Sequence, residues 1–315
     1  MTDNNRQSLL KFLYLGIAVI AYGYLAYRLA TYDRYADLAG QLSNVTGLQA
    51  AALGLAVALF PLNIMAEAVK WRYLLRGVYP MTLRESIRQV YYGTAGAFIT
   101  PARLGEYPTR VAVFRREAVS VGDVLIPAVA LGFVGSFALS ALQVITGIPA
   151  AMRVMSLDRH VWVAGGVLLA VYLLTPMLCR RLQKRLSADS SRPSRLTATV
   201  EALARLTAGE LTVTLLLSAV RYLIYCCQLA LVLYSCSVSI TMPDLAIAIA
   251  TYYLLVTVTP SVPIADVGIR GSWAVVVFSQ YSGNLPGIAV ATLIMWIINS
   301  VLPMIVGSVM MHKTP

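Results

Sequence analysis

Charged residues are scarce in this sequence, and histidine and cysteine are scarcer. Asp, Glu, Lys and Arg make up 12% of the 315 residues, which is about half the share of a soluble domain. There are two histidines and four cysteines, and the cysteines have no Cys-x-x-Cys spacing. This composition argues against a metal site of the His/Cys type, so we expect no metal.

Motifs for catalysis are also lacking. There is no paired-carboxylate metal motif of a glycosyltransferase, no Ser/His arrangement and no nucleotide-binding loop. His160 and His312 both lie at the ends of apolar runs. We therefore expect no catalytic residue and no cofactor, and a transporter rather than an enzyme. Without a nucleotide loop, any pumping would depend on an ion gradient or on the substrate's own gradient.

Apolar residues dominate instead. Hydrophobic residues make up 58% of the chain, and the mean hydropathy is +0.72. Together with long apolar runs, these values predict an all-α polytopic membrane protein with a single integral membrane domain, residues 1–315. The net charge of +11 comes from Lys and Arg in the loops, as the positive-inside rule predicts. A face for anionic lipid headgroups is the alternative reading; nucleic acid is not expected.

Six apolar runs are near the length that spans a bilayer. The expected spanning helices are Leu9–Leu29, Leu48–Val69, Val121–Ile148, Val161–Leu178, Leu211–Cys236 and Ile288–Met311. The distribution of Lys and Arg places both termini in the cytoplasm of a multi-pass protein of the cytoplasmic (inner) membrane. Between the fourth and fifth runs, Ser187–Ser194 reads as a flexible linker. Thr197–Leu206 reads as a short amphipathic helix on the membrane surface.

Two further apolar runs are interrupted. Tyr91–Arg116 breaks at Thr100-Pro101, and Tyr252–Arg270 breaks at Thr259-Pro260. The residue before a proline is disfavoured in the helical conformation, and each run is too short to span. We expect two re-entrant helical hairpins, at about residues 87–117 and 245–281, because irregular backbone at membrane depth needs protein or water around it.

The order of the expected elements repeats. Helix, helix, re-entrant hairpin and helix occur in residues 8–159 and again in 160–315, the first copy starting inside and the second outside. This is an inverted repeat, an arrangement in which transporter sites form where discontinuous helices meet near the bilayer midplane.

A few charged residues lie within or beside the apolar runs. A charge near the bilayer centre costs at least ~2.5–3.5 kcal/mol, so such residues need partners and mark functional sites. The candidate substrate-binding residues are Arg103, Glu106, Arg110, Arg221, Asp266 and Arg270. Glu67, Lys70 and Arg72 are supporting candidates, with Lys70 and Arg72 expected to extend to the membrane interface. The expected helix-breaking residues are Pro101, Gly105, Pro260, Pro263 and Gly268.

The spacing of these charges leaves two readings open. Glu106 and Arg110 are four residues apart, as are Asp266 and Arg270, so each pair would share one face of a helix. The pairs are then either internal ion pairs that hold the hairpins against the bundle, or parts of an anion site. For an anion site, arginine offers a planar fork of donors to phosphate, and broken helices offer free backbone N–H groups.

The segment TPARLGE, followed by Arg110 and preceded by EAVKWRYLL, resembles the lysylphosphatidylglycerol synthase transmembrane-region family. The Pro-x-Arg-x-Gly-Glu core is formed by Pro101, Arg103, Gly105 and Glu106. The resemblance covers essentially the whole chain. It implies a flippase-like protein that moves a lipid with a charged or phosphorylated head. The chain ends without the soluble aminoacyl-transferase domain of bifunctional members, so it resembles a stand-alone flippase portion.

The second motif of that family is matched only in part, by PSVPIADVGIRG. Gly268 and Arg270 fit, Gly271 replaces the usual Glu, and Ile264-Ala265 replace small glycines. Asp266 is the candidate for the missing carboxylate. This departure from the family motif affects the expected substrate more than the expected fold.

The function expected from the sequence is a flippase, or translocase, for a lipid with an anionic or phosphate-containing head. The alternatives are a secondary transporter of a small soluble anion, and an accessory protein or enzyme for lipid-linked sugars. The expected partners are a membrane lipid substrate and the bilayer itself. A homo-oligomer is left open.

Overall fold

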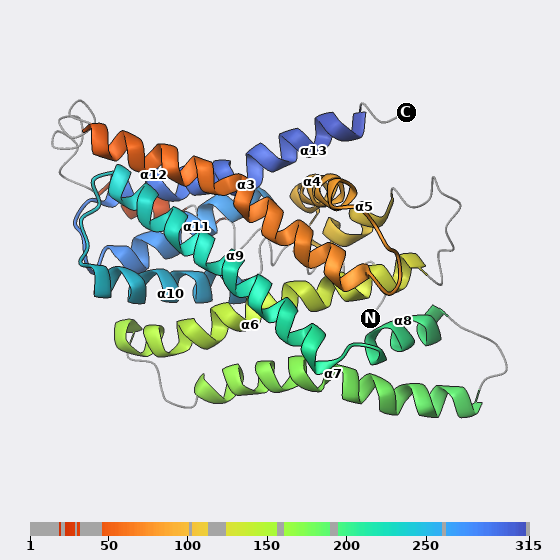
Figure 1. Cartoon of the computed structure of the whole chain (residues 1–315). Coiled ribbons are helices and arrows are strands. Elements are labelled where there is room, and N and C mark those ends of the chain that lie inside the picture. The colour runs from red at the N-terminus through yellow and green to blue at the C-terminus, as the bar shows by residue number, and fades with distance from the viewer. Residues whose placement is uncertain are drawn as a thin grey trace.

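The computed structural model describes residues 19, 23–28, 30–31, 46–100, 103–112, 124–155, 161–189, 195–259 and 263–312. Within these residues every regular element is a helix (Figure 1). The helices are α3 (Gly47–Leu75), α4 (Leu83–Ile99), α5 (Glu106–Ala112), α6 (Ile126–Met155), α7 (Val161–Asp189), α8 (Arg195–Ala204), α9 (Ala208–Ser235), α10 (Met242–Val258), α11 (Pro263–Phe278), α12 (Leu285–Trp296), the π-helical turn η4 (Ile297–Val301) and α13 (Leu302–His312). The expected all-α class is confirmed.

Three of these helices begin with the same local signal. Thr46, Thr82 and Thr207 are the N-caps of α3, α4 and α9, and each forms a capping box with a Gln or Glu three residues on. The threonine hydroxyl accepts a hydrogen bond from the third backbone N–H, and the longer side chain accepts from the threonine N–H. Two N–H groups that would otherwise lack partners are satisfied, which fixes where each helix starts.

Four described helical stretches are long and apolar enough to cross a membrane. They are Gly47–Leu75, Ile126–Val154, Ala208–Ser235 and Leu285–His312, and each overlaps an expected span. Most of the first expected span, Leu9–Leu29, lies outside the described residues, although residues 23–28 are helical. The number of six spans and the re-entrant course of the hairpins stay predictions.

The expected linker at Ser187–Ser194 is partly wrong. Helix α7 begins at the expected Val161 but continues to Asp189, so the first three residues of that segment are helical. Its basic residues Arg180, Arg181 and Lys184 therefore lie on a helix and not in a loop; helix α8 is close to the expected amphipathic helix. Serine alone does not end a helix, because its propensity is only modestly lower than that of alanine.

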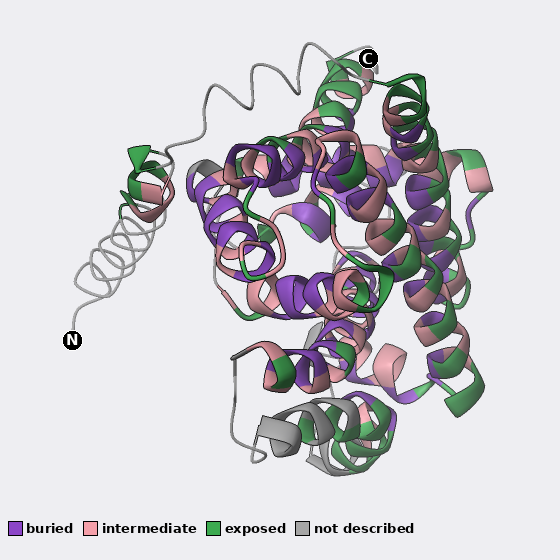
Figure 2. Cartoon of the chain, turned by 90° about the vertical axis from the view of Figure 1, so that its left-hand side faces the viewer, coloured by how far each residue is buried: buried purple, intermediate pink, exposed green. Residues whose placement is uncertain are grey.

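The core of the bundle is built on α3 and α9, which pack along one another. Around them, α6 packs on α10, and α4 packs on α13. Helices α7 and α8 lie together beside α6, at the edge of the bundle in Figure 1. Figure 2 shows that buried residues gather on the inward sides of the helices, whereas exposed residues cover the outside.

Helices α4 and α10 match one another in detail. Each has 17 residues, follows a threonine N-cap and ends at an extended threonine C-cap. The caps are Thr82 and Thr100 in one helix and Thr241 and Thr259 in the other, so both pairs are 159 residues apart. In the sequence, a proline follows each C-cap. The extended backbone at both C-caps is what a following proline favours.

A glycine permits close packing against each of these helices. A Cβ at Gly147 of α6 would collide with Leu254 and with the carbonyl oxygen of Ala250 on α10. A Cβ at Gly307 of α13 would collide with the carbonyl oxygen of Tyr91 on α4. Ala250 and Tyr91 are each the ninth residue of their helix, and the two glycines are 160 residues apart. The two helix pairs therefore meet in the same register.

Candidate functional site

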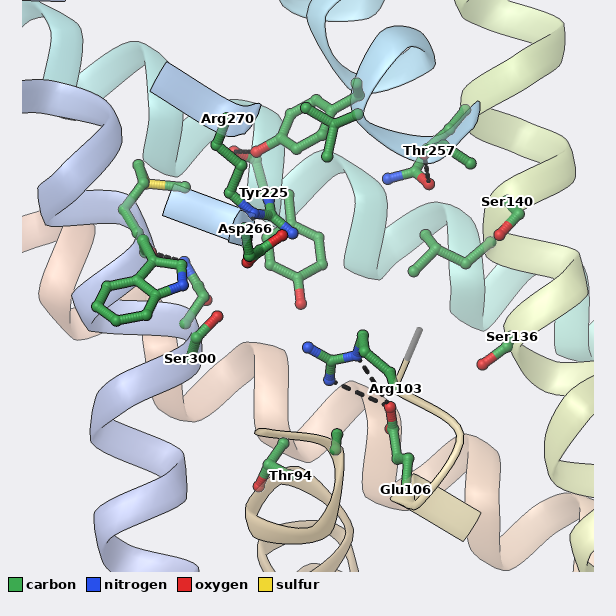
Figure 3. A pocket seen from close by; sticks show the side chains of 18 of the residues that line it. Thr94, Arg103, Glu106, Ser136, Ser140, Tyr225, Thr257, Asp266, Arg270 and Ser300 are labelled. Atoms are coloured by element: carbon green, nitrogen blue, oxygen red, sulfur yellow. Dashed lines mark hydrogen bonds and ion pairs between the residues drawn. The ribbon is translucent and has the colours of Figure 1, made fainter. Parts of the chain in front are cut away.

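A cavity of about 460 Å³ lies where α4, α5, α6, α9, α10, α11 and the α12–η4 segment converge. Its charged lining consists of Arg103, Glu106, Arg221, Asp266 and Arg270. Figure 3 shows Arg103 and Glu106 reaching into the cavity from one side, and Asp266 and Arg270 from the other. Both interrupted segments thus contribute charge to one space.

The turn that joins α4 to α5 carries Arg103. The Thr100 hydroxyl accepts a hydrogen bond from the Gly105 N–H (2.8 Å) and donates one to the Gly96 carbonyl oxygen (2.9 Å). Arg103 has a φ of 58°, in the left-handed region that costs a non-glycine residue roughly 1–2 kcal/mol. Its Nε and Nη2 atoms lie 3.2 and 3.1 Å from Oε2 of Glu106.

Glu67 on α3 lies at the centre of the buried charge. Its carboxylate oxygens are 2.8 Å from Nζ of Lys70, 2.9 Å from Nη2 of Arg110 and 2.6 Å from Nη1 of Arg221. The Glu67 side chain is 2% exposed. These groups, together with Glu106 and Arg103, form a network of ion pairs that we call the charge cluster.

Arg110 of α5 is the most deeply buried member of the charge cluster. Its side chain is fully buried and contacts both Glu67 and Glu106. Its guanidinium carbon also lies 5.1 and 4.9 Å from the ring centres of Trp71 and Tyr107, within the range of cation–π attraction. Arg110 does not line the cavity, so it holds α5 in place rather than facing the cavity.

Positive charge exceeds negative charge in the charge cluster. It holds four basic side chains, those of Lys70, Arg103, Arg110 and Arg221, and two carboxylates, those of Glu67 and Glu106. The formal excess is two positive charges beside a cavity. Buried charge of one sign is costly unless it is compensated, so an anion in the cavity would be favoured.

The second interrupted segment supplies a similar pair. Nε of Arg270 lies 2.9 Å from Oδ2 of Asp266, one turn apart on α11. Glu106 and Asp266 are 160 residues apart, as are Arg110 and Arg270. Nε1 of Trp273 donates to the Thr259 hydroxyl (2.9 Å), which fixes α11 against the end of α10. Unlike Arg110, Arg270 lines the cavity.

Uncharged polar groups line the rest of the cavity. Ser136, Ser140 and Gln143 come from α6, whereas Asn299 and Ser300 come from η4. Nδ2 of Asn63 on α3 donates to Oδ1 of Asn299 (2.9 Å), and Nε of Arg221 donates to Oδ1 of Asn63 (2.8 Å). This chain of hydrogen bonds connects the cavity wall to the charge cluster.

The structure brings most of the expected residues together. Arg103, Glu106, Arg221, Asp266 and Arg270 share the cavity, and both expected i, i+4 pairs form ion pairs on helices. Gly105 lies in the turn before α5, where a Cβ would crowd Gly96 and Thr100. Pro263 is the first residue of α11, a position that suits proline. Pro101 and Pro260 lie outside the described residues.

Arg110, a candidate substrate-binding residue, does not line the cavity, and two further expectations are wrong. Lys70 does not reach the membrane interface: it is 2% exposed, contacts Glu67 and donates to the carbonyl oxygen of Gly135 (3.1 Å). Gly268 does not break a helix, because it lies inside α11. Arg72 is exposed, and its Nε donates to the carbonyl oxygen of Met81 (2.9 Å); its level in the membrane stays a prediction.

The sequence reasoning missed the uncharged polar partners. Asn63, Gln143 and Asn299 each lie in an apolar run and contact the site or line it. A polar amide in a spanning segment is itself a signal, since it must find a partner there. Tyr225, which receives a hydrogen bond from Nη2 of Arg221 (3.1 Å), gave no such signal, because tyrosines are common at membrane interfaces.

The comparisons with known proteins place the chain by family. The model of the family described as the lysylphosphatidylglycerol synthase TM region matches residues 13–307, which is nearly the whole chain. Among the curated proteins, no match was found.

Proposed function

The chain belongs to the family of the lysylphosphatidylglycerol synthase transmembrane region, and from this premise we propose that it is a lipid translocase. The substrate is a lipid with an anionic, phosphate-containing head, and the protein moves that head across the cytoplasmic membrane. The family itself supports a membrane protein linked to lipid handling. The anionic head and the translocation are our proposal.

The excess of positive charge beside the cavity is the observation that carries this proposal. Arg103 of the α4–α5 turn, Arg221 of α9 and Arg270 of α11 line the cavity, against two carboxylates. Arg103 and Arg270 extend into it from opposite sides (Figure 3). A phosphate between them would receive forked hydrogen bonds from two guanidinium groups, the geometry for which arginine is suited.

Exposed apolar side chains at the helix ends favour a lipid over a soluble anion. Ile99 is 78% exposed and Val258 is 58% exposed. They directly precede Thr100 and Thr259, which line the cavity. Leu104, next to Arg103, is 57% exposed. In a bilayer such side chains contact acyl chains, so a lipid could place its head in the cavity while its chains stay in the membrane.

The matched registers of α4 and α10 support a mechanism with two halves. In the proposed topology the two hairpins enter the membrane from opposite sides, with both termini in the cytoplasm, as inverted repeats. The cavity lies between them, and rocking one repeat against the other would open it to each side in turn. The glycine contacts of Gly147 and Gly307 would be the equivalent packing surfaces of the two repeats.

Translocation in proteoliposomes tests the proposal. A headgroup-labelled anionic phospholipid is placed in both leaflets, and a membrane-impermeant quencher reports the fraction that reaches the outer leaflet. Wild-type protein should expose the inner-leaflet label, and R270A should not. As a matched control, R205A removes an exposed arginine whose ion pair with Glu201 lies away from the cavity.

Two results would contradict the proposal. Label movement no faster than in protein-free liposomes would exclude translocation. Uptake of inorganic phosphate into the same liposomes, without lipid movement, would support a transporter of a small soluble anion instead. Normal lipid movement in R270A would remove Arg270 from the site.

A further inference from the structure

Hydroxyl and amide groups occupy the part of the cavity wall that lies between the two arginine-bearing hairpins. Ser140 of α6 and Ser300 of η4 project into the cavity from opposite walls (Figure 3). No hydrogen bond joins either hydroxyl to another of the described residues. The two serines are 160 residues apart, so they occupy the same register that relates Glu106 to Asp266.

Gln143 adds a further donor next to Ser140. Its Oε1 accepts a hydrogen bond from the Thr257 hydroxyl (2.7 Å), which orients the amide and leaves its NH₂ group as a donor. Gln143 as a whole is 9% exposed. Such groups pair with a ligand that both donates and accepts hydrogen bonds, as an alcohol does.

The carboxylates of the cavity are already engaged. Glu106 contacts Arg103 and Arg110, and Asp266 contacts Arg270. A ligand ammonium group has donors only and would need acceptors of negative charge. Here it would compete with guanidinium groups for both carboxylates, beside a cluster that already carries a positive excess.

The size of the cavity exceeds that of a bare phosphate. The volume of about 460 Å³ is many times the roughly 10–15 Å³ that a cavity needs to hold one water molecule. A phosphate group has five heavy atoms, so a further polar group of comparable size fits beside it. Trp296 and Phe133 also line this space and offer apolar faces to the C–H groups of a polyol.

Resting on the proposed function, we infer that the translocated head is a phosphodiester that carries an uncharged polyhydroxyl group, such as glycerol, a cyclitol or a sugar, and no amine. Arg103 and Arg270 hold the phosphate. Ser140, Ser300 and Gln143 hydrogen-bond the hydroxyl groups and determine the specificity among anionic lipids.

Native mass spectrometry of the full chain in detergent tests this inference. The protein is titrated with lipids of identical acyl chains: phosphatidylglycerol, phosphatidylinositol, phosphatidic acid, phosphatidylethanolamine and lysylphosphatidylglycerol. We expect the first two to bind about tenfold more tightly than the other three, a ratio that two neutral hydrogen bonds can supply. Soluble glycerol phosphate, added as a competitor, should displace them only weakly, because it lacks the acyl chains.

A double variant, S140A/S300A, tests the proposed role of the serines. It should lose the preference for phosphatidylglycerol over phosphatidic acid while keeping its affinity for phosphatidic acid. The matched control is S308A, which removes an exposed hydroxyl of α13 outside the cavity. It should bind like the wild type. A double variant that keeps the full preference would overturn the assignment of the two serines.

The remaining outcomes separate this inference from the proposed function. Phosphatidic acid bound as tightly as phosphatidylglycerol would mean that phosphate alone is recognised. Equal or tighter binding of either aminated lipid would overturn the exclusion of amines. In both cases the proposed translocation of an anionic or phosphate-containing lipid would still stand. Binding of glycerol phosphate as tight as that of the lipids would point to a soluble substrate, and binding of no lipid at all would overturn the proposed function itself.

Discussion

Glu67 neutralises more buried charge than any other single residue described. Three basic side chains contact it, from α3, α5 and α9. Arg110 also forms an ion pair with Glu106. Lys70 and Arg221 each form their ion pair with Glu67. Removing one member of a buried ion pair leaves uncompensated charge, which costs more than the pair itself contributes.

The variant E67Q should therefore be strongly destabilised, by about 3–5 kcal/mol. The midpoint of thermal unfolding of the detergent-purified protein measures this. The control is E201Q, which removes the partner of Arg205 in an exposed pair and should cost at most about 1 kcal/mol. If E67Q unfolds at the same temperature as E201Q, the charge cluster does not hold the helices together.

Arg103 combines a strained backbone with a side chain that lines the cavity. In R103G the left-handed conformation loses its steric cost, roughly 1–2 kcal/mol, whereas Glu106 keeps Arg110 as a partner. We predict that R103G is as stable as the wild type, or slightly more stable, and that it fails to translocate lipid. Unfolding and proteoliposome assays on the same preparation check this. Retained transport would separate Arg103 from the substrate.

The sequence predicted which charged residues belong to the site. It did not predict which of them line the cavity and which only hold helices together. A charged residue in an apolar run is conspicuous because its insertion is costly. Arg110 and Arg270 look alike in sequence, each four residues after a carboxylate. Only the packing of Trp71, Tyr107 and Glu67 around Arg110 removes it from the cavity, and such long-range contacts leave no local pattern.

The elements that position the site are the matched helices α4 and α10. Each begins at a threonine, runs for 17 residues and ends at a threonine that lines the cavity. The sequence predicted both breaks from Thr-Pro, because proline disfavours a helical residue before it. The helix starts at Thr82 and Thr241 were not predicted, although a capping box marks the start at Thr82.

The glycine contacts of these helices should be sensitive to a single methyl group. G147A and G307A place a Cβ against backbone carbonyl oxygens of α10 and α4, and each should lose about 1–3 kcal/mol. G54A is the matched control: Gly54 lies within α3 with nothing near its would-be Cβ, so alanine should stabilise the helix by about 0.5–1 kcal/mol. The midpoints of thermal unfolding give the order of stability of the three variants. The reverse order would refute the close packing.

For the whole molecule, the sequence predicted the all-α class and the pairing of two interrupted segments. Hydropathy defines apolar helices well, since bilayer thickness sets their length. It did not predict that α7 continues through its basic residues to Asp189, because charge suits a helix as well as a loop. The side of the membrane from which each hairpin enters stays a prediction. Hydropathy and the distribution of charge indicate that side only indirectly.

The proposed inverted topology predicts opposite accessibility at the starts of α4 and α10. In a variant in which Cys179, Cys226, Cys227 and Cys236 are replaced, single cysteines are introduced as R84C and M242C, at exposed positions. A membrane-impermeant thiol reagent added to intact cells should label M242C, and should label R84C only after permeabilisation. Labelling of both from the same side would rule out the inverted repeat.

In the proposed mechanism, one lipid head contacts both interrupted segments. A phosphatidylglycerol analogue with a photoactivatable group in its head, crosslinked to the wild-type protein in liposomes, tests this most directly. The crosslinked peptides, identified by mass spectrometry, should come from residues 94–107 and from residues 252–270. Crosslinks confined to the outer helices α7 and α8, with none in either segment, would contradict the proposed binding site.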